Sequence, residues 1–158
     1  MSIGTKILNK IVSLAQATGG QVEGNKDITD EMKNLARTTA EEGVVMLKND
    51  GVLPLSENDV VAVFGRVQND WFYVGYGSGG DVKPPYKVNL IEGLENEGVK
   101  IDETLKKIYA DWSVKNAPYE GFWGHWPFHF DEMPLSDKVV GEAAKRANKA
   151  IVVIGRAA

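Results

Sequence analysis

The stretch Val60-Val-Ala-Val-Phe-Gly65 has the pattern of a β-strand that is apolar on both faces and stops at a glycine. A strand with one face in water alternates apolar and polar residues, whereas a strand covered by helices on both faces is apolar throughout. Residues 99–101 and 151–154 share this character. Together the three stretches predict an α/β fold, a three-layer sandwich in which a mostly parallel sheet lies between helices.

Helical patterns separate these strands. We expect a helix that is capped by Asp27 or Thr29, ends at Gly43 and buries one stripe made of Met32, Leu35, Ala36, Thr39 and Ala40. Residues 44–47 then form a short apolar run that resembles an additional strand. Further helices are predicted at 89–96, at 104–113, and from Ser136 or Asp137 to Ala147.

The composition restricts the class of protein. A chain of 158 residues with 43% hydrophobic and 25% charged residues is typical of one globular domain. The net charge of −4 argues against a nucleic-acid partner. The absence of cysteine excludes thiolate catalysis and cysteine-based zinc sites, and it fits a reducing compartment, so we predict a cytoplasmic location.

Residues 1–28 are expected to form a helical leader followed by a linker. Ile7, Ile11, Leu14 and Ala15 share one helical face, and Asn9 and Lys10 interrupt any continuous apolar core of a signal peptide. No apolar run approaches the length of a membrane span, so no membrane partner is predicted.

The glycine-rich stretch GYGSGG, Gly75 to Gly80, matches the G-x-G-x-x-G pattern of dinucleotide-binding loops. That motif needs a strand directly before it and a helix that opens within it. Here the strand ends ten residues too early, and Pro84 and Pro85 prevent a helix from following. A nucleotide site is therefore the weakest of the functions considered, and no cofactor is predicted.

Residues 36–55, ARTTAEEGVVMLKNDGVLPL, carry a family resemblance. They resemble the stretch that opens the second domain of glycoside hydrolase family 3: a helix ending in A-x-E-G, a run similar to V-x-L-L-K-N, and a nearby L-P-L. The same order of elements continues with the strand at 60–65, the glycine loop at 75–80, the helix containing Glu92-Gly-Leu94, and the strand at 151–155. The similarity covers about residues 29–158.

This resemblance implies an (α/β)6 sandwich domain, incomplete within residues 29–158, that works with a (β/α)8 barrel of the same chain. The barrel is expected beyond residue 158, in an enzyme of reversed domain order. The implied function is that of a fragment of a retaining glycoside hydrolase, most simply a β-glucosidase, whose substrate is a β-linked oligosaccharide or an aryl glycoside. The alternative is a carbohydrate-binding or interaction module without catalysis.

The resemblance also places the site. In the family the glycine loop helps to shape the sugar pocket, which makes Tyr76, Gly77, Ser78, Gly79, Gly80 and, as an aromatic platform, Trp123 the candidate substrate-binding residues. No catalytic residue is assigned to this chain, because the nucleophile is implied on the barrel and the acid/base on the loop after Gly155. The spacing of Glu120, Asp131 and Glu132 does not support them as substitutes.

Several side chains near residues 112–130 keep two interpretations open. Six aromatic residues either pack this segment or contact sugar: Trp112, Phe122, Trp123, Trp126, Phe128 and Phe130. His125 and His129 lack a third ligand, and we predict no metal site. Because an incomplete sandwich leaves an apolar face uncovered, the chain is also expected to expose an apolar patch or to associate with itself.

Overall fold

A computed structural model describes residues 27–72, 86–119 and 129–155, together with residues 4, 6–8, 10, 11 and 14. The described residues among the first fourteen are helical. The side chains of Ile7, Ile11 and Leu14 are exposed there.

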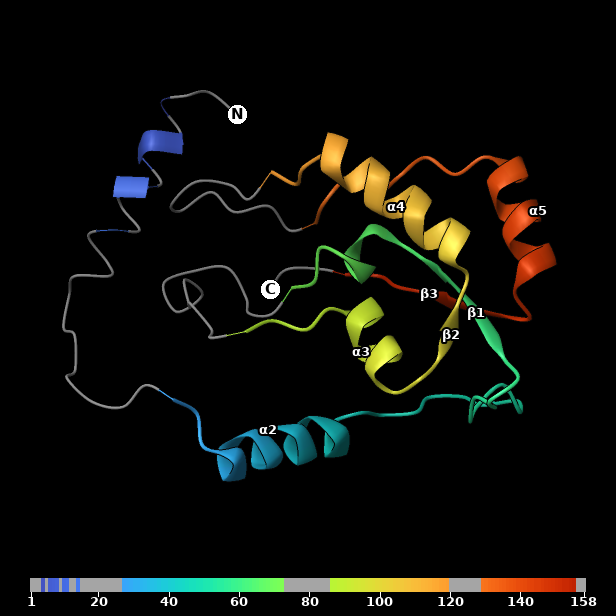
Figure 1. The fold of residues 1–158 in the computed structure, drawn as a ribbon, viewed down its shortest axis with the longest axis horizontal. Coiled ribbons are helices and arrows are strands. Elements are labelled where there is room, and N and C mark those ends of the chain that lie inside the picture. The colour runs from blue at the N-terminus through green and yellow to red at the C-terminus, as the bar shows by residue number, and fades with distance from the viewer. Residues whose placement is uncertain are drawn as a thin grey trace.

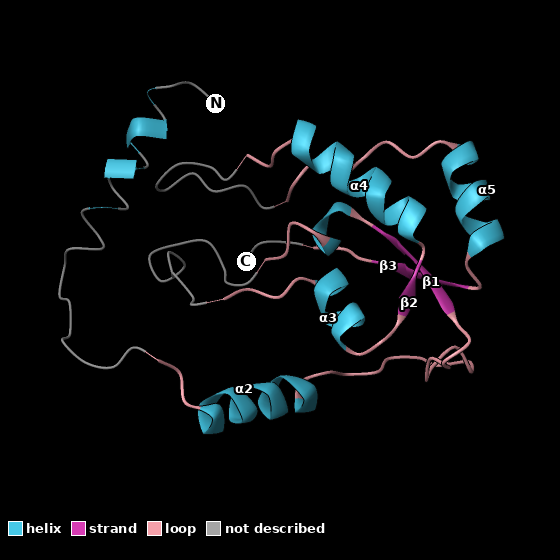
Figure 2. Ribbon diagram, viewed as in Figure 1, coloured by secondary structure: helices cyan, strands magenta, loops and turns pink. Residues whose placement is uncertain are grey.

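The sheet has three described strands, β1 (Val60–Phe64), β2 (Lys100–Ile101) and β3 (Lys149–Val152), in the order β2-β1-β3. Both pairings are parallel; Val61 lies beside Ile101 on one side and beside Lys149 on the other. Figures 1 and 2 show helices on both sides of these strands. The predicted α/β arrangement with a parallel sheet is confirmed.

The four α-helices that the structure describes between residues 30 and 146 begin after residues whose side chains accept hydrogen bonds from the first turn, and two of these caps, Thr29 and Ser136, are among the candidates that the sequence offers. Thr29 caps one helix, Asn89 forms a capping box with Glu92, and Ser136 caps the last helix. The elements are α2 (Asp30–Glu42), the short 3-10 helix η1 (Arg66–Gln68), α3 (Leu90–Asn96), α4 (Glu103–Lys115) and α5 (Asp137–Arg146).

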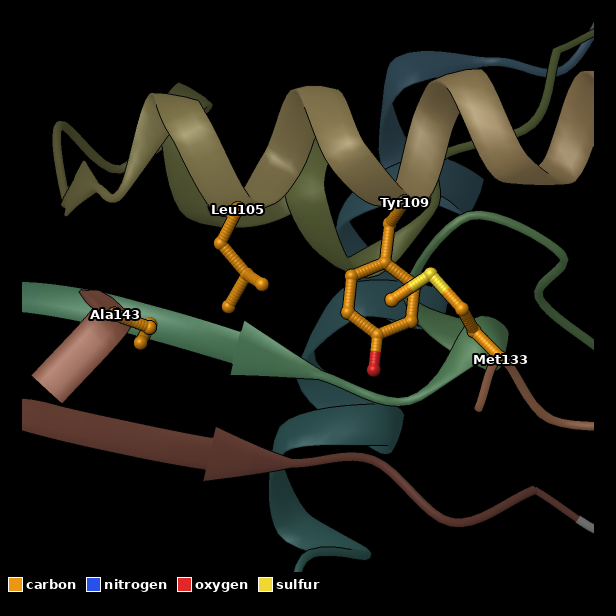
Figure 3. Close-up of a cluster of buried hydrophobic side chains, with 5 residues drawn as sticks. Leu105, Tyr109, Met133 and Ala143 are labelled. Carbon is orange, nitrogen blue, oxygen red and sulfur yellow. The ribbon is translucent and has the colours of Figure 1, made fainter. Parts of the chain in front are cut away.

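Adjacent residues of β1 supply two separate cores, because successive side chains of a strand point to opposite faces. Ala62 packs in a cluster with Leu105 and Tyr109 of α4, Ala143 of α5 and Met133, and Figure 3 labels these four partners. On the opposite face, Val61 and Val63 pack against Ile91 of α3 and against Ile101. Burial of β1 on both faces explains its uninterrupted apolar sequence.

An ion pair joins the amino end of α4 to the carboxyl end of α5. The Asp102 carboxylate caps α4 and accepts hydrogen bonds from Arg146 Nε at 2.9 Å and Arg146 Nη2 at 2.8 Å. Burial alone would raise the pKa of Asp102, but the hydrogen bonds from Arg146 and from the backbone of Leu105 and Thr104 hold it below its ordinary value.

The prediction of a buried α2 stripe is wrong for this chain. Every residue from 27 to 54 is exposed, including Met32 at 56% and Leu35 at 60%. The predicted strand at 44–47 is also wrong: these residues form neither helix nor strand, and Leu47 is 94% exposed. The periodicity of apolar residues indicates which face of a helix favours burial, but no part of the chain that the structure describes covers this face of α2.

The third strand differs from its prediction in two ways. It begins at Lys149 and ends at Val152, and its burial alternates, so that Val152 is 68% exposed. Ile154, predicted as strand, lies beyond it and is 90% exposed. β3 has a paired neighbour, β1, on one side of the described sheet only. Among the described residues, no helix combines the length and apolar character that crossing a membrane requires.

Candidate functional site

The candidate site lies where β1 ends, because ligands of open parallel sheets bind at the carboxyl edge. Gly65 terminates β1 with φ of 102°, a conformation that residues with a Cβ rarely adopt. A Cβ at this position would lie 2.2 Å from the carbonyl oxygen of Val153. The Gly65 N–H donates to Tyr109 Oη at 2.9 Å. Glycine is therefore required for β1 and the end of β3 to approach so closely.

Tyr109 is part of the same turn. Its ring is buried in the core under α4, as Figure 3 shows, and its hydroxyl reaches the backbone of Gly65. Burial raises the pKa of Tyr109, so the hydroxyl stays protonated at neutral pH. A protonated hydroxyl that accepts one buried N–H makes Tyr109 a structural support of the turn.

Arg66, the next residue, is a charged side chain that is only 2% exposed. Its Nε donates to Asp70 Oδ2 at 2.8 Å, and its Nη1 donates to the carbonyl of Asp131 at 2.8 Å. Its Nη2 donates to the carbonyl of Asn116. The guanidinium also lies over the Trp112 ring, 4.7 Å from the centroid. A buried cation needs this degree of pairing, and the planar fork of arginine supplies it.

The contacts of Arg66 bring Asp70, four residues on, together with two segments that lie 50 and 65 residues away. Asp70 precedes the glycine-rich stretch at 75–80, and Asn116 and Asp131 flank residues 117–130, which we call the aromatic segment. The backbone N–H of Arg66 in addition donates to Glu132 Oε2 at 2.8 Å. One side chain thus ties Asn116 and Asp131, on either side of the aromatic segment, and Asp70, which precedes the glycine-rich stretch, to the end of β1.

An aromatic contact joins the same two stretches. The rings of Phe72 and Phe130 have centroids 4.7 Å apart and planes tilted by 34°. The Phe130 ring also lies 5.8 Å from the Arg66 guanidinium. Gly155, at the other side of this cluster, has no room for a Cβ, which would lie 2.5 Å from Val67 Cγ2. The carboxyl ends of β1 and β3 are consequently packed together by side chains from η1 and from both flanking segments.

Gln68 is the second buried polar residue of η1. Its Nε2 donates to the carbonyls of Val63 at 3.1 Å and of Gly65 at 2.9 Å, which fixes the turn from the inside. Its Oε1 has no hydrogen-bond partner within the described part of the chain. The amide therefore supports the same turn as Tyr109 does.

A groove of about 430 Å³ opens beside Arg66. Its aromatic lining comes from Trp112, Tyr119 and Phe130, and Tyr119 is 54% exposed. Its other lining residues are Arg66, Asn116, Ala117, Pro118, His129 and Asp131. Apolar and aromatic walls with a few polar groups are typical of sites for small ligands, sugars among them.

The predicted site residues Tyr76, Gly77, Ser78, Gly79, Gly80 and Trp123 lie outside the described residues. The same holds for Glu120, Phe122, His125, Trp126 and Phe128. Of the aromatic residues with two open interpretations, Trp112 and Phe130 are described, and both pack against Arg66. Packing is therefore the role that the contacts give to these two rings.

Asp131 and Glu132 are tied into the same cluster, Asp131 by its carbonyl and Glu132 by its carboxylate. Their contacts give them a structural role and no carboxylate partner. Within the ranges that the structure describes, no group of three or more histidine or acidic residues could hold a metal ion.

Sequence reasoning missed Arg66, Gln68 and Tyr109. The first two carried a signal: they directly follow the glycine that ends a buried strand, which is the edge where functional loops begin. Tyr109 carried none, because one tyrosine within an amphipathic helix is compatible with any position on the boundary of a core.

Known proteins resemble this chain over most of its length. A family model described as the glycosyl hydrolase family 3 C-terminal domain matches residues 44–158. A curated β-glucosidase from Ruminococcus albus is 42% identical over 135 residues, which are 84% of this chain and 14% of that protein. The chain therefore spans about one seventh of the length of this relative.

Solved structures agree. A β-glucosidase from Paenibacillus barengoltzii matches with a TM-score of 0.79 and 39% identity, over 84% of this chain and 15% of that one. β-Glucosidase 3B from Thermotoga neapolitana, solved in complex with glucose, matches with a TM-score of 0.72 and 35% identity, over 82% of this chain and 18% of that one.

Proposed function

This chain belongs to glycosyl hydrolase family 3, in the C-terminal domain of that family, and on that premise we propose that it serves as the sandwich-domain portion of a β-glucosidase. The proposed reaction is hydrolysis of terminal β-linked sugars from an oligosaccharide or an aryl glycoside. Support comes from the relatives, of which the three compared above are named β-glucosidases.

The observation that carries this proposal is the anchoring by Arg66. Asp70, Asn116 and Asp131, which precede or follow the stretches predicted to contact sugar, are tied to the carboxyl edge of the sheet. Rigid attachment of ligand-contacting loops is a general requirement of a site, since a small displacement of reacting groups costs much of the rate. We propose that Tyr76, Ser78, Trp123 and the glycines at 77, 79 and 80 contact the sugar from these anchored stretches.

A retaining glycosidase needs two carboxyl groups about 5–5.5 Å apart, one as nucleophile and one as acid/base. We assign neither to the described residues, because the Glu132 carboxylate accepts a hydrogen bond from the Arg66 N–H and the spacing of Asp131 does not support a catalytic role. In this proposal the chain binds and orients the sugar, and the carboxyl groups come from the rest of the polypeptide. The proposed domain division is a leader at 1–28, the sandwich from 29, and a (β/α)8 barrel that completes the site.

We propose a cytoplasmic location for the chain. The lack of cysteine agrees with the cytoplasm and with other reducing compartments.

A segment exchange tests the function. In the Ruminococcus albus β-glucosidase, the segment matched by this chain is replaced with the corresponding residues of this chain, and turnover of a chromogenic β-glucoside is measured. We expect the chimera to retain turnover and the isolated chain to show none. A folded but inactive chimera would contradict the proposed function. Turnover by the isolated chain that Glu132→Gln abolishes would place the active site within this chain.

The affinity of the isolated chain for a sugar distinguishes the proposed function from the alternative, a carbohydrate-binding module without catalysis. An isolated chain that serves only as part of an enzyme site should bind cellobiose weakly, with Kd in the millimolar range, about 4 kcal/mol. Micromolar binding by the isolated chain, together with an inactive chimera, would favour a carbohydrate-binding module. The titration is followed by tryptophan fluorescence, because Trp112 lines the groove.

A further inference from the structure

The groove beside Arg66 has one aromatic ring that the fold leaves available. Two of its three aromatic lining residues are held by packing: Trp112 lies under the Arg66 guanidinium, and Phe130 packs against Phe72. Tyr119 differs from them, because within the described residues its side chain makes no ring contact and no hydrogen bond. It is also 54% exposed. A ring that lines a groove without a packing partner can stack on a ligand.

Polar groups of the groove are available as hydrogen-bond acceptors. The backbone carbonyl of Asp131 accepts from Arg66 Nη1 at 2.8 Å, but its carboxylate has no partner within the described ranges. The Asn116 side chain donates through Nδ2 to the Trp112 carbonyl at 2.9 Å, and its Oδ1 accepts no hydrogen bond from the described part of the chain. An aromatic face beside acceptors for hydroxyl groups suits a sugar ring.

The charges of the groove disfavour an anionic ligand. An exposed guanidinium with free donors would attract an anion, but Arg66 Nε, Nη1 and Nη2 all donate within the chain. The charge of Arg66 is paired with the Asp70 carboxylate at 2.8 Å. Asp131 lines the groove, and the Glu132 carboxylate accepts from the Arg66 N–H, so both add negative charge. The fitting ligand is therefore neutral and carries hydroxyl groups.

The place and size of the groove match one part of a glycoside. Its volume of about 430 Å³ is in the range of small-ligand sites. Its lining residues come from η1, from α4 and from both ends of the aromatic segment, which contains Trp123. A glycoside has two parts, the sugar that the enzyme transfers and the leaving group. Because the proposed contacts of Tyr76, Ser78 and Trp123 serve the transferred sugar, the groove is left for the leaving group.

We propose that the groove binds the leaving group of the substrate and that Tyr119 determines which leaving groups are favoured. This inference rests on the proposed function. A glucose unit and a phenyl ring each have a flat apolar face that stacks on Tyr119, whereas a methyl group is too small to cover the ring. The Asp131 carboxylate accepts a hydrogen bond from a sugar hydroxyl and gains nothing from a phenyl ring. Tyr119 is thus a specificity-determining residue, and Asp131 distinguishes sugar from aryl leaving groups.

The test compares three substrates of the chimera described above: cellobiose, phenyl β-glucoside and methyl β-glucoside. The transferred glucose is the same in each, so an effect that differs among them arises at the leaving group. We expect Tyr119→Ala to lower kcat/KM for cellobiose and phenyl β-glucoside by about threefold to tenfold, the range for one lost aromatic contact. For methyl β-glucoside, kcat/KM should change by less than about twofold. Asp131→Asn should lower kcat/KM for cellobiose alone.

Tyr86→Ala is the matched control. Tyr86 is 57% exposed, close to the exposure of Tyr119, and does not line the groove. We expect Tyr86→Ala to leave kcat/KM unchanged for all three substrates. Tyr119→Phe keeps the ring and removes the hydroxyl, so it should retain the wild-type preference among them. Equal losses on all three substrates from Tyr119→Ala, or the same selective loss from Tyr86→Ala, would overturn the inference.

Binding to the isolated chain distinguishes failure of this inference from failure of the proposed function. Cellobiose and phenyl β-glucoside should change the tryptophan fluorescence with Kd in the millimolar range, and Tyr119→Ala should weaken both by about threefold to tenfold. Cellobionate, a charged analogue, should bind more weakly than cellobiose, and tighter binding would contradict a site for neutral ligands. An active chimera whose substrate preference ignores Tyr119→Ala would overturn the inference and leave the proposed function standing. A folded, inactive chimera would refute the proposed function, and the leaving-group role with it, even where the isolated chain binds cellobiose through Tyr119.

Discussion

Asp102 offers the most direct test of how the helical layer is held. Its side chain is 2% exposed and serves two elements at once, as the cap of α4 and as the partner of Arg146 at the end of α5. The replacement Asp102→Asn keeps a side-chain oxygen for the cap but removes the charge. It therefore separates the ion pair from the cap, whereas Asp102→Ala removes both.

The magnitude follows from the exposure of the two partners. Removing one partner of a fully buried pair costs about 3–5 kcal/mol. Arg146 is 33% exposed and regains part of its hydration, so we expect a lower cost of about 2–3 kcal/mol for Asp102→Asn. A lost cap adds about 1 kcal/mol, so Asp102→Ala should cost about 3–4 kcal/mol. These losses are large fractions of the free energy of unfolding of an ordinary domain.

The pH dependence has a definite sign. The folded-state pKa of Asp102 lies below its ordinary value, so its charge stabilises the folded state at neutral pH. This contribution is fully present above about pH 5, where unfolded aspartate is also ionised, and is lost as the pH falls through the folded-state pKa. Urea unfolding of wild type and Asp102→Asn should therefore differ most at pH 7 and converge as the pH falls below about 4.

Arg146→Met provides the control through a double-mutant cycle. If Asp102 acts through Arg146, the double variant should be much less destabilised than the sum of the two single variants. Additive losses, or a difference between wild type and Asp102→Asn that does not shrink at low pH, would refute the role of the pair.

Three other predictions concern the same fold. Gly65→Ala should cost about 2 kcal/mol or more in the free energy of urea unfolding, because it strains φ at 102° and places a Cβ against the Val153 carbonyl; an unchanged unfolding curve would contradict this. Arg66→Lys keeps the charge but loses the planar fork and the stacking on a tryptophan, so we expect a red shift of tryptophan emission and weaker cellobiose binding; unaltered emission and binding would oppose it. Ser136→Ala should cost about 1 kcal/mol by removing the cap of a packed helix, whereas Thr29→Ala should leave global stability unchanged because α2 is not packed; equal effects would show that α2 folds together with the core.

Sequence alone was sufficient for the parts of the fold that a strong local signal determines. The uninterrupted apolar run at β1 indicated two covered faces, and the structure places one core on each. The caps Thr29 and Ser136 are each one of the two candidates that the sequence indicated. In each case the residues that decide the structure are within a few positions of one another.

The predictions that failed needed information about distant packing. The stripe of α2 and the run at 44–47 were recognised as apolar, but whether such residues are buried depends on a partner that the described chain does not supply. β3 was predicted as buried on both faces, yet its burial alternates because the described sheet ends with it. A local sequence pattern indicates which residues favour burial, but it does not indicate whether another part of the protein buries them.

The candidate sugar-binding residues were predicted from the family resemblance. The residues that hold the turn after β1 in place were predicted neither from the resemblance nor from a sequence pattern. Arg66 illustrates why. A buried arginine is costly unless its charge and its donors are satisfied, and the groups that satisfy its guanidinium are Asp70, four residues on, and the carbonyls of Asn116 and Asp131, 50 and 65 residues away. The residues next to Arg66 in the sequence do not indicate that Asn116 and Asp131 are its partners.

The buried guanidinium also links stability to function in this domain. The Arg66 guanidinium keeps its hydrogen bonds only while Asp70, the Asn116 carbonyl and the Asp131 carbonyl stay in place. Those same groups mark the ends of the stretches proposed to contact sugar. Displacement of either stretch would leave a buried cation short of acceptors, at a cost of about 1–3 kcal/mol for each lost partner. The cost of moving these ends is therefore set by the core of the domain, so a variant that weakens sugar contact through Arg66 should also lower the free energy of unfolding.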